Sequence, residues 1–141
     1  MPAARQFSAR MDASVLDRLE RRGAHAGLNK SRLAERYIDE GMRIDDHPGI
    51  VFRDGPAGRR PGLAAGPDVW EVIGVLKGAP ERGEAAILYT ADYLNLPPTG
   101  VRSAVSYYAA YTGEIDEWVA RNDAEAEAAE AAWRREQAAL A

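Results

Sequence analysis

The stretch Arg5-Gln6-Phe7-Ser8-Ala9-Arg10-Met11 alternates polar and apolar residues near the start of the 141-residue chain. This period of two is typical of a β-strand with one buried face. A single strand would leave its backbone edges unpaired, and this chain offers little to cover its apolar face. The sequence therefore predicts that a second copy of the chain supplies a matching strand, so that the two form a two-stranded ribbon.

Two helical patterns follow the predicted strand. Asp12 is a candidate N-cap for the first helix, because its carboxylate can accept hydrogen bonds from free backbone N–H groups. Gly23 and Gly27 break that pattern. Asn29 or Ser31 can cap the second helix. The apolar residues of the two helices are Val15, Leu16 and Leu19, then Leu33, Ala34, Tyr37, Ile38 and Met42.

The polar side of the predicted strand carries Gln6, Ser8 and Arg10. If the apolar residues of the strand face the core, these three side chains face outward. A two-stranded ribbon fits the major groove of B-DNA, where Arg pairs with guanine, Gln with adenine and Ser with either. We expect the three residues to read bases, within a DNA-binding domain that spans residues 1–46. The alternative is an ordinary solvent-facing strand.

The segment Asn29-Lys30-Ser31 places backbone N–H groups and a lysine at the start of the second predicted helix. A helix N-terminus attracts phosphate through its dipole and its free N–H groups. We therefore expect Asn29, Lys30 and Ser31, together with Arg5, to hold the DNA backbone. Simple helix capping is the alternative, and the two roles are compatible because a cap can also touch phosphate.

The net charge of −4 at pH 7 argues against a nucleic-acid partner, but its distribution along the chain does not. Residues 1–32 carry seven Lys or Arg and three Asp or Glu, a net charge of +4. Residues 123–141 carry two Arg and five Asp or Glu, a net charge of −3. A basic head and an acidic tail indicate contact with a polyanion at one end of the chain only.

Residues 47–122 form the second predicted domain. Its first part is rich in Gly and Pro, and Ile50-Val51-Phe52 before Asp54-Gly55 predicts a short hairpin or arm. Helical patterns follow, and Asp68 can cap the first of them. The last two patterns are separated by Asn95-Leu96-Pro97-Pro98, a tight break that favours a helix-turn-helix.

Four residues of this domain are candidates for additional DNA contacts. Thr99 and Arg102 lie on the expected outer face of the last helix, from which they can reach DNA. The domain is net acidic, so self-association of its helices is an equally good role. Arg59 and Arg60, in the Gly-rich arm, are better candidates for an additional groove or phosphate contact.

Residues 123–141 are rich in Ala, Glu, Arg and Gln, which favour a helix. Trp133 and Leu140 are seven residues apart and so lie on one face of it, with Arg134 and Arg135 beside the tryptophan. Little other apolar material covers this helix, so we expect it to fray or protrude unless a partner holds it. The alternative is a solvated helix with no partner.

The sequence gives no support for an enzyme. It has no cysteine and two histidines, which excludes thiolate sites and gives no basis for a Ser/His/Asp arrangement. Residues 55–62 lack the spacing of a phosphate-binding loop, and Asp45-Asp46-His47 is better interpreted as a linker than as a metal site. We expect no cofactor and no metal.

Three tyrosines lie near the C-terminal end of the second predicted domain, namely Tyr107, Tyr108 and Tyr111. They are expected in a core or an interface.

The absence of a signal-peptide pattern and of a long apolar run predicts a cytoplasmic protein that does not enter a membrane.

Residues 5–44 resemble the ribbon-helix-helix family of DNA-binding proteins, the MetJ/Arc/CopG class. The resemblance is carried by Gln6-Phe7-Ser8-Ala9-Arg10 and by the predicted order of one strand and two helices. The resemblance implies a homodimer that places Gln6, Ser8 and Arg10 in the major groove and the start of the second helix on phosphates.

Residues 47–120 resemble a small domain of unknown function that is common in bacterial antitoxins. The resemblance is carried by His47-Pro48-Gly49-Ile50, Val69-Trp70-Glu71-Val72, Leu96-Pro97-Pro98, Val101-Arg102 and Ala104-Val105-Ser106-Tyr107-Tyr108. Members usually have a Gly-Thr-Arg segment before the first helix, where this chain has Gly58-Arg59-Arg60-Pro61-Gly62. The helix-turn-helix of this domain is often suspected of binding DNA.

The order of the two resemblances matches an antitoxin of VapB type. It implies that the tail, through Trp133, Arg134, Arg135 and Leu140, binds a PIN-like ribonuclease toxin, whose acidic metal-binding site an arginine can enter. The expected chain is mainly α, with a ribbon-helix-helix domain (1–46), a helix-turn-helix domain with a short hairpin (47–122) and a helical tail (123–141). The expected function is a homodimeric repressor that binds a palindromic operator of its own operon and neutralises the toxin. The alternative is a stand-alone transcriptional regulator with no toxin.

Overall fold

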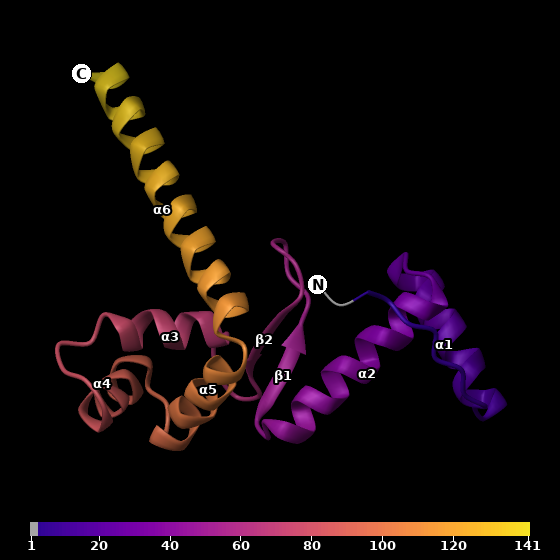
Figure 1. Ribbon diagram of the computed structural model, residues 1–141. Coiled ribbons are helices and arrows are strands. Elements are labelled where there is room, and N and C mark those ends of the chain that lie inside the picture. The colour runs from indigo at the N-terminus through magenta and orange to yellow at the C-terminus, as the bar shows by residue number, and fades with distance from the viewer. Residues whose placement is uncertain (1–2) are drawn as a thin grey trace. The chain divides into compact units, whose positions relative to one another are not determined.

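The structure, a computed structural model, describes residues 3–141 and is mainly helical (Figure 1). These residues form six helices and one two-stranded antiparallel sheet. They divide into two compact units, with the boundary between Met42 and Arg43. The elements are α1 (Ala13–Ala26), α2 (Lys30–Asp46), β1 (Ile50–Arg53), β2 (Arg60–Leu63), α3 (Val69–Lys77), α4 (Glu84–Leu94), α5 (Pro98–Ala110) and α6 (Thr112–Leu140). Among residues 3–141, no helix combines the length and hydropathy needed to cross a membrane.

The first helix, α1, begins and ends where the sequence predicts. The Asp12 carboxylate accepts a hydrogen bond from the Ser14 backbone N–H at 2.8 Å and so caps the first turn. Hydrogen bonds from the Ser14 hydroxyl and backbone N–H hold the pKa of Asp12 below its ordinary value. Gly27 ends the helix in the left-handed conformation, with φ at 69°.

Gly23 does not break α1, contrary to the prediction. It is buried within the helix, and a Cβ atom at this position would lie 2.8 Å from the Leu28 carbonyl oxygen. The Leu28 N–H donates to the Gly23 carbonyl oxygen at 2.9 Å, so the chain turns back over the glycine after the helix ends. Gly23 therefore permits a close backbone approach in the connection to α2.

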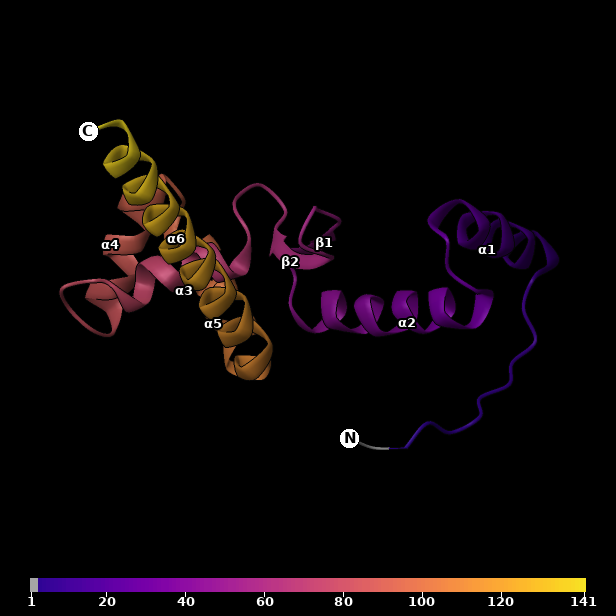
Figure 2. The ribbon, with the colours of Figure 1, turned by 90° about the horizontal axis from the view of Figure 1, so that it is seen from above.

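Residues 3–12 form no strand within the single chain and run as an irregular segment (Figure 2). A strand needs a hydrogen-bonded ladder, and the strand predicted here takes its ladder from a second copy of the chain. The ribbon therefore stays a prediction, while the helices on which it would rest lie where the sequence places them.

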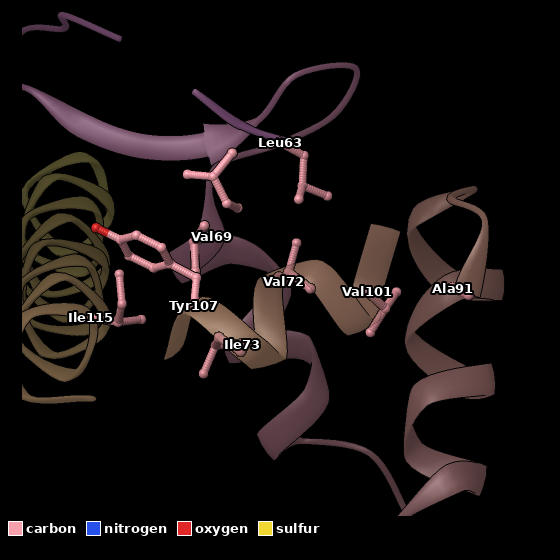
Figure 3. Packing of buried hydrophobic residues seen from close by; sticks show 10 residues of the cluster. Leu63, Val69, Val72, Ile73, Ala91, Val101, Tyr107 and Ile115 are labelled. Atoms are coloured by element: carbon pink, nitrogen blue, oxygen red, sulfur yellow. The ribbon is translucent and has the colours of Figure 1, made fainter. Parts of the chain in front are cut away.

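The second unit has a core built around Tyr107. The strands β1 and β2 pair antiparallel, with Ile50 opposite Leu63, which confirms the predicted hairpin. Side chains from β2, α3, α4, α5 and the start of α6 converge on one cluster, and Figure 3 labels Leu63, Val69, Val72, Ile73, Ala91, Val101, Tyr107 and Ile115. Tyr107 is fully buried, which confirms its prediction as a core residue.

The connection between α4 and α5 also lies where the sequence predicts it. Asn95 ends α4 in the left-handed conformation, with φ at 53°, and Pro98 occupies the first turn of α5. The buried face of α5 is formed by Val101, Ala104 and Tyr107. The opposite face of α5 is left on the surface.

One buried carboxylate joins the hairpin to α3. Asp68 is 5% exposed and accepts hydrogen bonds from Arg53 and from Arg60, which face each other across the two strands. The Trp70 indole N–H donates to the same carboxylate at 3.2 Å. Asp68 occupies the N-cap position of α3, as predicted, but its side chain makes no capping hydrogen bond because the arginines engage it.

The last helix, α6, continues far beyond the core (Figure 1). Its first turns bury Ile115 and pack Val119 against the core, as the sequence predicts. From residue 120 to residue 141 every residue is exposed except the half-buried Ala132. The tail is therefore a helix that projects from its own unit.

Replacing Asp68 tests the link between hairpin and helix. Asp68→Ala should lower the free energy of unfolding by about 2–4 kcal/mol, because it leaves two half-buried guanidinium groups and an indole N–H without their acceptor. The control is Asp116→Ala, which removes an exposed carboxylate that binds Lys77 and Tyr108. Its effect should be clearly smaller in the same denaturant titration. Equal losses for the two variants would contradict the role given to Asp68.

Candidate nucleic-acid interface

The three residues predicted to read bases lie together on the irregular segment before α1. Gln6, Ser8 and Arg10 are all exposed. The apolar residues that alternate with them are exposed too, with Phe7 79% and Met11 47% accessible to solvent. In a single chain this segment therefore has both of its sides open.

The two helices of the first unit also expose apolar side chains to solvent. Leu33 of α2 is fully buried and Leu16, Leu19 and Leu28 are half-buried, but other apolar side chains of the unit are open to solvent. The exposed apolar side chains of this unit are Phe7, Met11, Val15, Tyr37, Ile38 and Met42. A groove of about 630 Å³ runs between the irregular segment and α2, and Phe7, Ile38 and Met42 contribute its apolar lining. Exposed apolar patches of this kind are typical of interaction sites.

The predicted phosphate-binding residues lie at the start of α2. Asn29 caps this helix, because its side-chain oxygen accepts from the Arg32 N–H at 2.8 Å. The N–H groups of Lys30 and Ser31 fall in the first turn, where an α-helix offers no carbonyl acceptor. The Lys30 ammonium lies 3.3 Å from the Glu20 carboxylate, and both side chains are about half exposed. Such a surface ion pair is weak, so it can give way to phosphate.

The candidate additional contacts in the second unit are mostly engaged within the protein. Arg60 is held by the buried Asp68, and Arg59 forms an ion pair with Asp54 at 3.2 Å. Arg102 binds the two carboxylate oxygens of Glu84. Thr99 is exposed in the first turn of α5. The structure therefore gives Arg60 a structural role, whereas Arg102 and Glu84 form a surface pair in which both side chains are about half exposed.

The predicted toxin-binding residues are all on the projecting part of α6. Trp133 is 59% exposed and Leu140 is 80% exposed. Arg134 forms an ion pair with Glu130 one turn earlier, and Arg135 is exposed. Trp133 and Leu140 continue, at intervals of seven residues, the stripe that begins with the packed Val119. The face of α6 that packs on the core thus runs on along the projecting tail.

Sequence reasoning missed a cluster at the start of the second unit. The Arg43 guanidinium donates to the Tyr107 hydroxyl and to the Glu114 carboxylate, each at 2.7 Å, and lies 4.0 Å from the centre of the Tyr111 ring. Burial opposes the charge on Arg43, but these two hydrogen bonds outweigh it and raise its pKa. Burial raises the pKa of Tyr107 to about 12. The cluster fastens the last turn of α2 to α5 and α6.

Sequence reasoning also missed a basic face on α1, formed by Arg18, Arg21, Arg22 and His25. Their spacing by three and four residues is a pattern from which a stripe along one side of the helix could have been predicted.

Within residues 3–141, the structure brings no three His, Cys, Asp or Glu side chains together as a metal site, and Asp45-Asp46-His47 belongs to no such group. Comparisons of the chain with family models, with curated proteins and with solved structures found no match.

The cap of α2 can be tested on its own. Asn29→Ala should lower the free energy of unfolding by about 1 kcal/mol, because the Arg32 N–H loses its acceptor, whereas Asn29→Ser should retain most of it. Asn122→Ala makes the same chemical change in the exposed middle of α6, where alanine favours the helix, and should cause no loss. Thermal unfolding followed by circular dichroism measures all three. No difference between the two alanine variants would show that Asn29 does not act as a cap.

Proposed function

We propose that the chain is a homodimeric, sequence-specific DNA-binding antitoxin, which represses its own operon from a palindromic operator and neutralises a PIN-like ribonuclease toxin. The observation that carries the proposal is the uncovered apolar surface of residues 3–42, in a unit whose two helices follow the segment predicted to be the strand. The alternative is a stand-alone regulator of the same architecture without a toxin.

The apolar surface supports the homodimer. Burying an exposed Phe, Ile or Met side chain stabilises a protein by about 1.5–3 kcal/mol. Phe7, Ile38 and Met42 line one continuous groove, so a second copy that covers it gains several such contributions at once. The strand predicted for residues 5–11 would at the same time find its hydrogen-bonding partner in the copy.

The polar residues support DNA as the ligand. In a paired ribbon, Gln6, Ser8 and Arg10 from each copy would stand on one face, and a ribbon fits the major groove. The start of α2, with Asn29, Lys30 and Ser31, offers free N–H groups and a positive dipole end for the flanking phosphates. Arg5 would add a further backbone contact next to the reading residues.

The engaged arginines of the second unit favour a supporting role for residues 47–122. Arg60 is held by the buried Asp68 of its own domain and so offers no unpaired charge to a phosphate, while Arg102 is paired with Glu84 at the surface. Self-association of these helices is therefore a better proposal than a second reading head. The tail, residues 123–141, is proposed to hold the toxin through Trp133 and Leu140, with Arg134 and Arg135 directed at an acidic metal site.

Substitution of Arg10 tests the reading strand. Arg10→Ala should cost about 1–3 kcal/mol of specific affinity for each guanine that the arginine binds. Arg10→Lys keeps the charge but lacks the planar donor pair, so it should lose specificity while it binds random duplex normally. The measurement is a gel-shift titration with a duplex from the promoter of the gene and with a random duplex. Normal operator binding by Arg10→Ala would exclude the ribbon as the reader.

Phe7→Ala in the same series separates folding from reading. It removes apolar contact area at the proposed dimer interface, so sedimentation should show a weaker dimer. Arg10→Ala should sediment like the wild-type chain, because in the predicted strand its side chain would be on the face opposite Phe7. If both variants dimerise normally but fail to bind, the interface lies elsewhere.

A chain that ends at Asn122 tests the tail. It should still dimerise and bind the operator, since the ribbon and the second domain are intact, but it should not neutralise the toxin. In the full chain, Trp133→Ala should weaken the toxin complex by about 2 kcal/mol or more if the indole is an interface anchor. Growth rescue on co-expression with the neighbouring nuclease, together with a pull-down, measures both. Full rescue by the shortened chain would leave the stand-alone regulator as the better account.

A further inference from the structure

A basic face on α1 has no role in the function proposed above. Arg18, Arg21, Arg22 and His25 follow one another at intervals of three, one and three residues, which places them on one side of the helix. They alone line a hollow of about 390 Å³. The apolar residues of α1, Leu16 and Leu19, are half-buried on the other side of the helix.

This face is not explained by the stability of the helix. Like charges three and four residues apart on a helix repel each other and destabilise it by about 0.2–0.5 kcal/mol per pair. In the part of the chain that the structure describes, no carboxylate forms an ion pair with Arg18, Arg21 or Arg22. The favourable effect of a cation near a helix C-terminus applies to the last turn, which contains His25. Among residues 3–42, the three arginines therefore have no carboxylate at ion-pair distance, although Asp17 lies one turn before Arg21.

The basic face is close in the chain to the proposed phosphate site but lies on another side of α1. Only Gly27, Leu28 and Asn29 separate the end of α1 from the start of α2. Glu20, which contacts Lys30 of α2 at 3.3 Å, lies two residues from both Arg18 and Arg22 and therefore on the opposite side of the helix from them. The basic face is thus a second cationic surface of the same unit, distinct from the start of α2.

We propose that the basic face of α1 binds the sugar–phosphate backbone of duplex DNA, as a contact additional to the one proposed at the start of α2. The inference rests on the proposed DNA-binding function and adds to it a surface that raises affinity without reading sequence. Arginine suits this role because its guanidinium can donate two parallel hydrogen bonds to one phosphate. The charge of the face, three arginines on one side of a helix, complements a polyanion.

Two adjacent arginine pairs in the chain provide a matched experiment. R21Q/R22Q removes two charges from the proposed face, and R134Q/R135Q removes two from the exposed tail, with the same residues and the same spacing. Glutamine is a good helix former, so both helices should persist. Affinity for a random-sequence duplex is measured by fluorescence anisotropy over a series of salt concentrations. Circular dichroism and sedimentation confirm that fold and oligomeric state are retained.

R21Q/R22Q should bind the duplex more weakly and should reduce the slope of log affinity against log salt by about two, one for each phosphate that the variant no longer binds. R134Q/R135Q should retain the wild-type slope. The ratio of affinities for the promoter duplex and the random duplex should change little in R21Q/R22Q, since no base-reading residue is altered.

Three results would overturn the inference. If the wild-type chain binds no duplex, the proposed function fails and the inference fails with it. If the wild-type chain binds and R21Q/R22Q retains the wild-type slope, the inference fails alone. If R21Q/R22Q retains the slope but no longer associates with further copies, the partner of the face is an acidic protein surface, such as Asp123, Glu127 and Glu130 of another copy, and not DNA.

Discussion

The first unit cannot bury its own apolar side chains, and this constraint shapes the rest of the molecule. Two short helices and an irregular segment enclose Leu33 but leave Phe7, Ile38 and Met42 open. A unit of some forty residues exposes a large share of its surface, so its apolar side chains are hard to enclose within it. On the proposal of a homodimer, a second copy would cover this surface and pair the predicted strand.

The second unit solves the same problem within one chain. Its helices and hairpin enclose Tyr107, and its charged groups turn inward onto partners of their own, as Arg43 does with Glu114 and Arg60 with Asp68. Breaking such half-buried pairs leaves an uncompensated charge, so they are not available to an external ligand at low cost. The unit thus has the properties of a scaffold, although Leu88, Tyr89 and Tyr93 of α4 and the far part of α6 also expose apolar side chains.

Local signals carried most of what could be predicted from the sequence. Asp12, Asn29 and Pro98 mark helix starts because capping depends on neighbouring residues alone, and the hairpin followed from a β-branched run before a turn. What failed depended on residues distant in the chain. Asp68 was predicted to cap a helix because the sequence next to it does not reveal its two arginine partners on the strands. Arg60 and Arg102 were predicted to contact DNA because the carboxylates that bind them are likewise not evident from the adjacent residues. Gly23 looked like a break because the backbone that approaches it belongs to the following loop. The strand predicted for residues 5–11 is a different case, since the partner proposed for it is a second copy of the chain.

The two units differ in how many of their cationic side chains are paired with carboxylates, and the net charge of the chain does not show this difference. In the second unit the guanidinium groups of Arg43, Arg53 and Arg102 face carboxylates. In the first unit the cations on the segment and on α1, among them Arg10, Arg21 and Arg22, face solvent. Paired charges cancel within a few ångströms, whereas unpaired ones contribute to the field at the distances over which a ligand approaches. An acidic chain can therefore present a positive surface to a polyanion, provided that its acidic residues either neutralise its own arginines or, as in the tail, lie on a separate element.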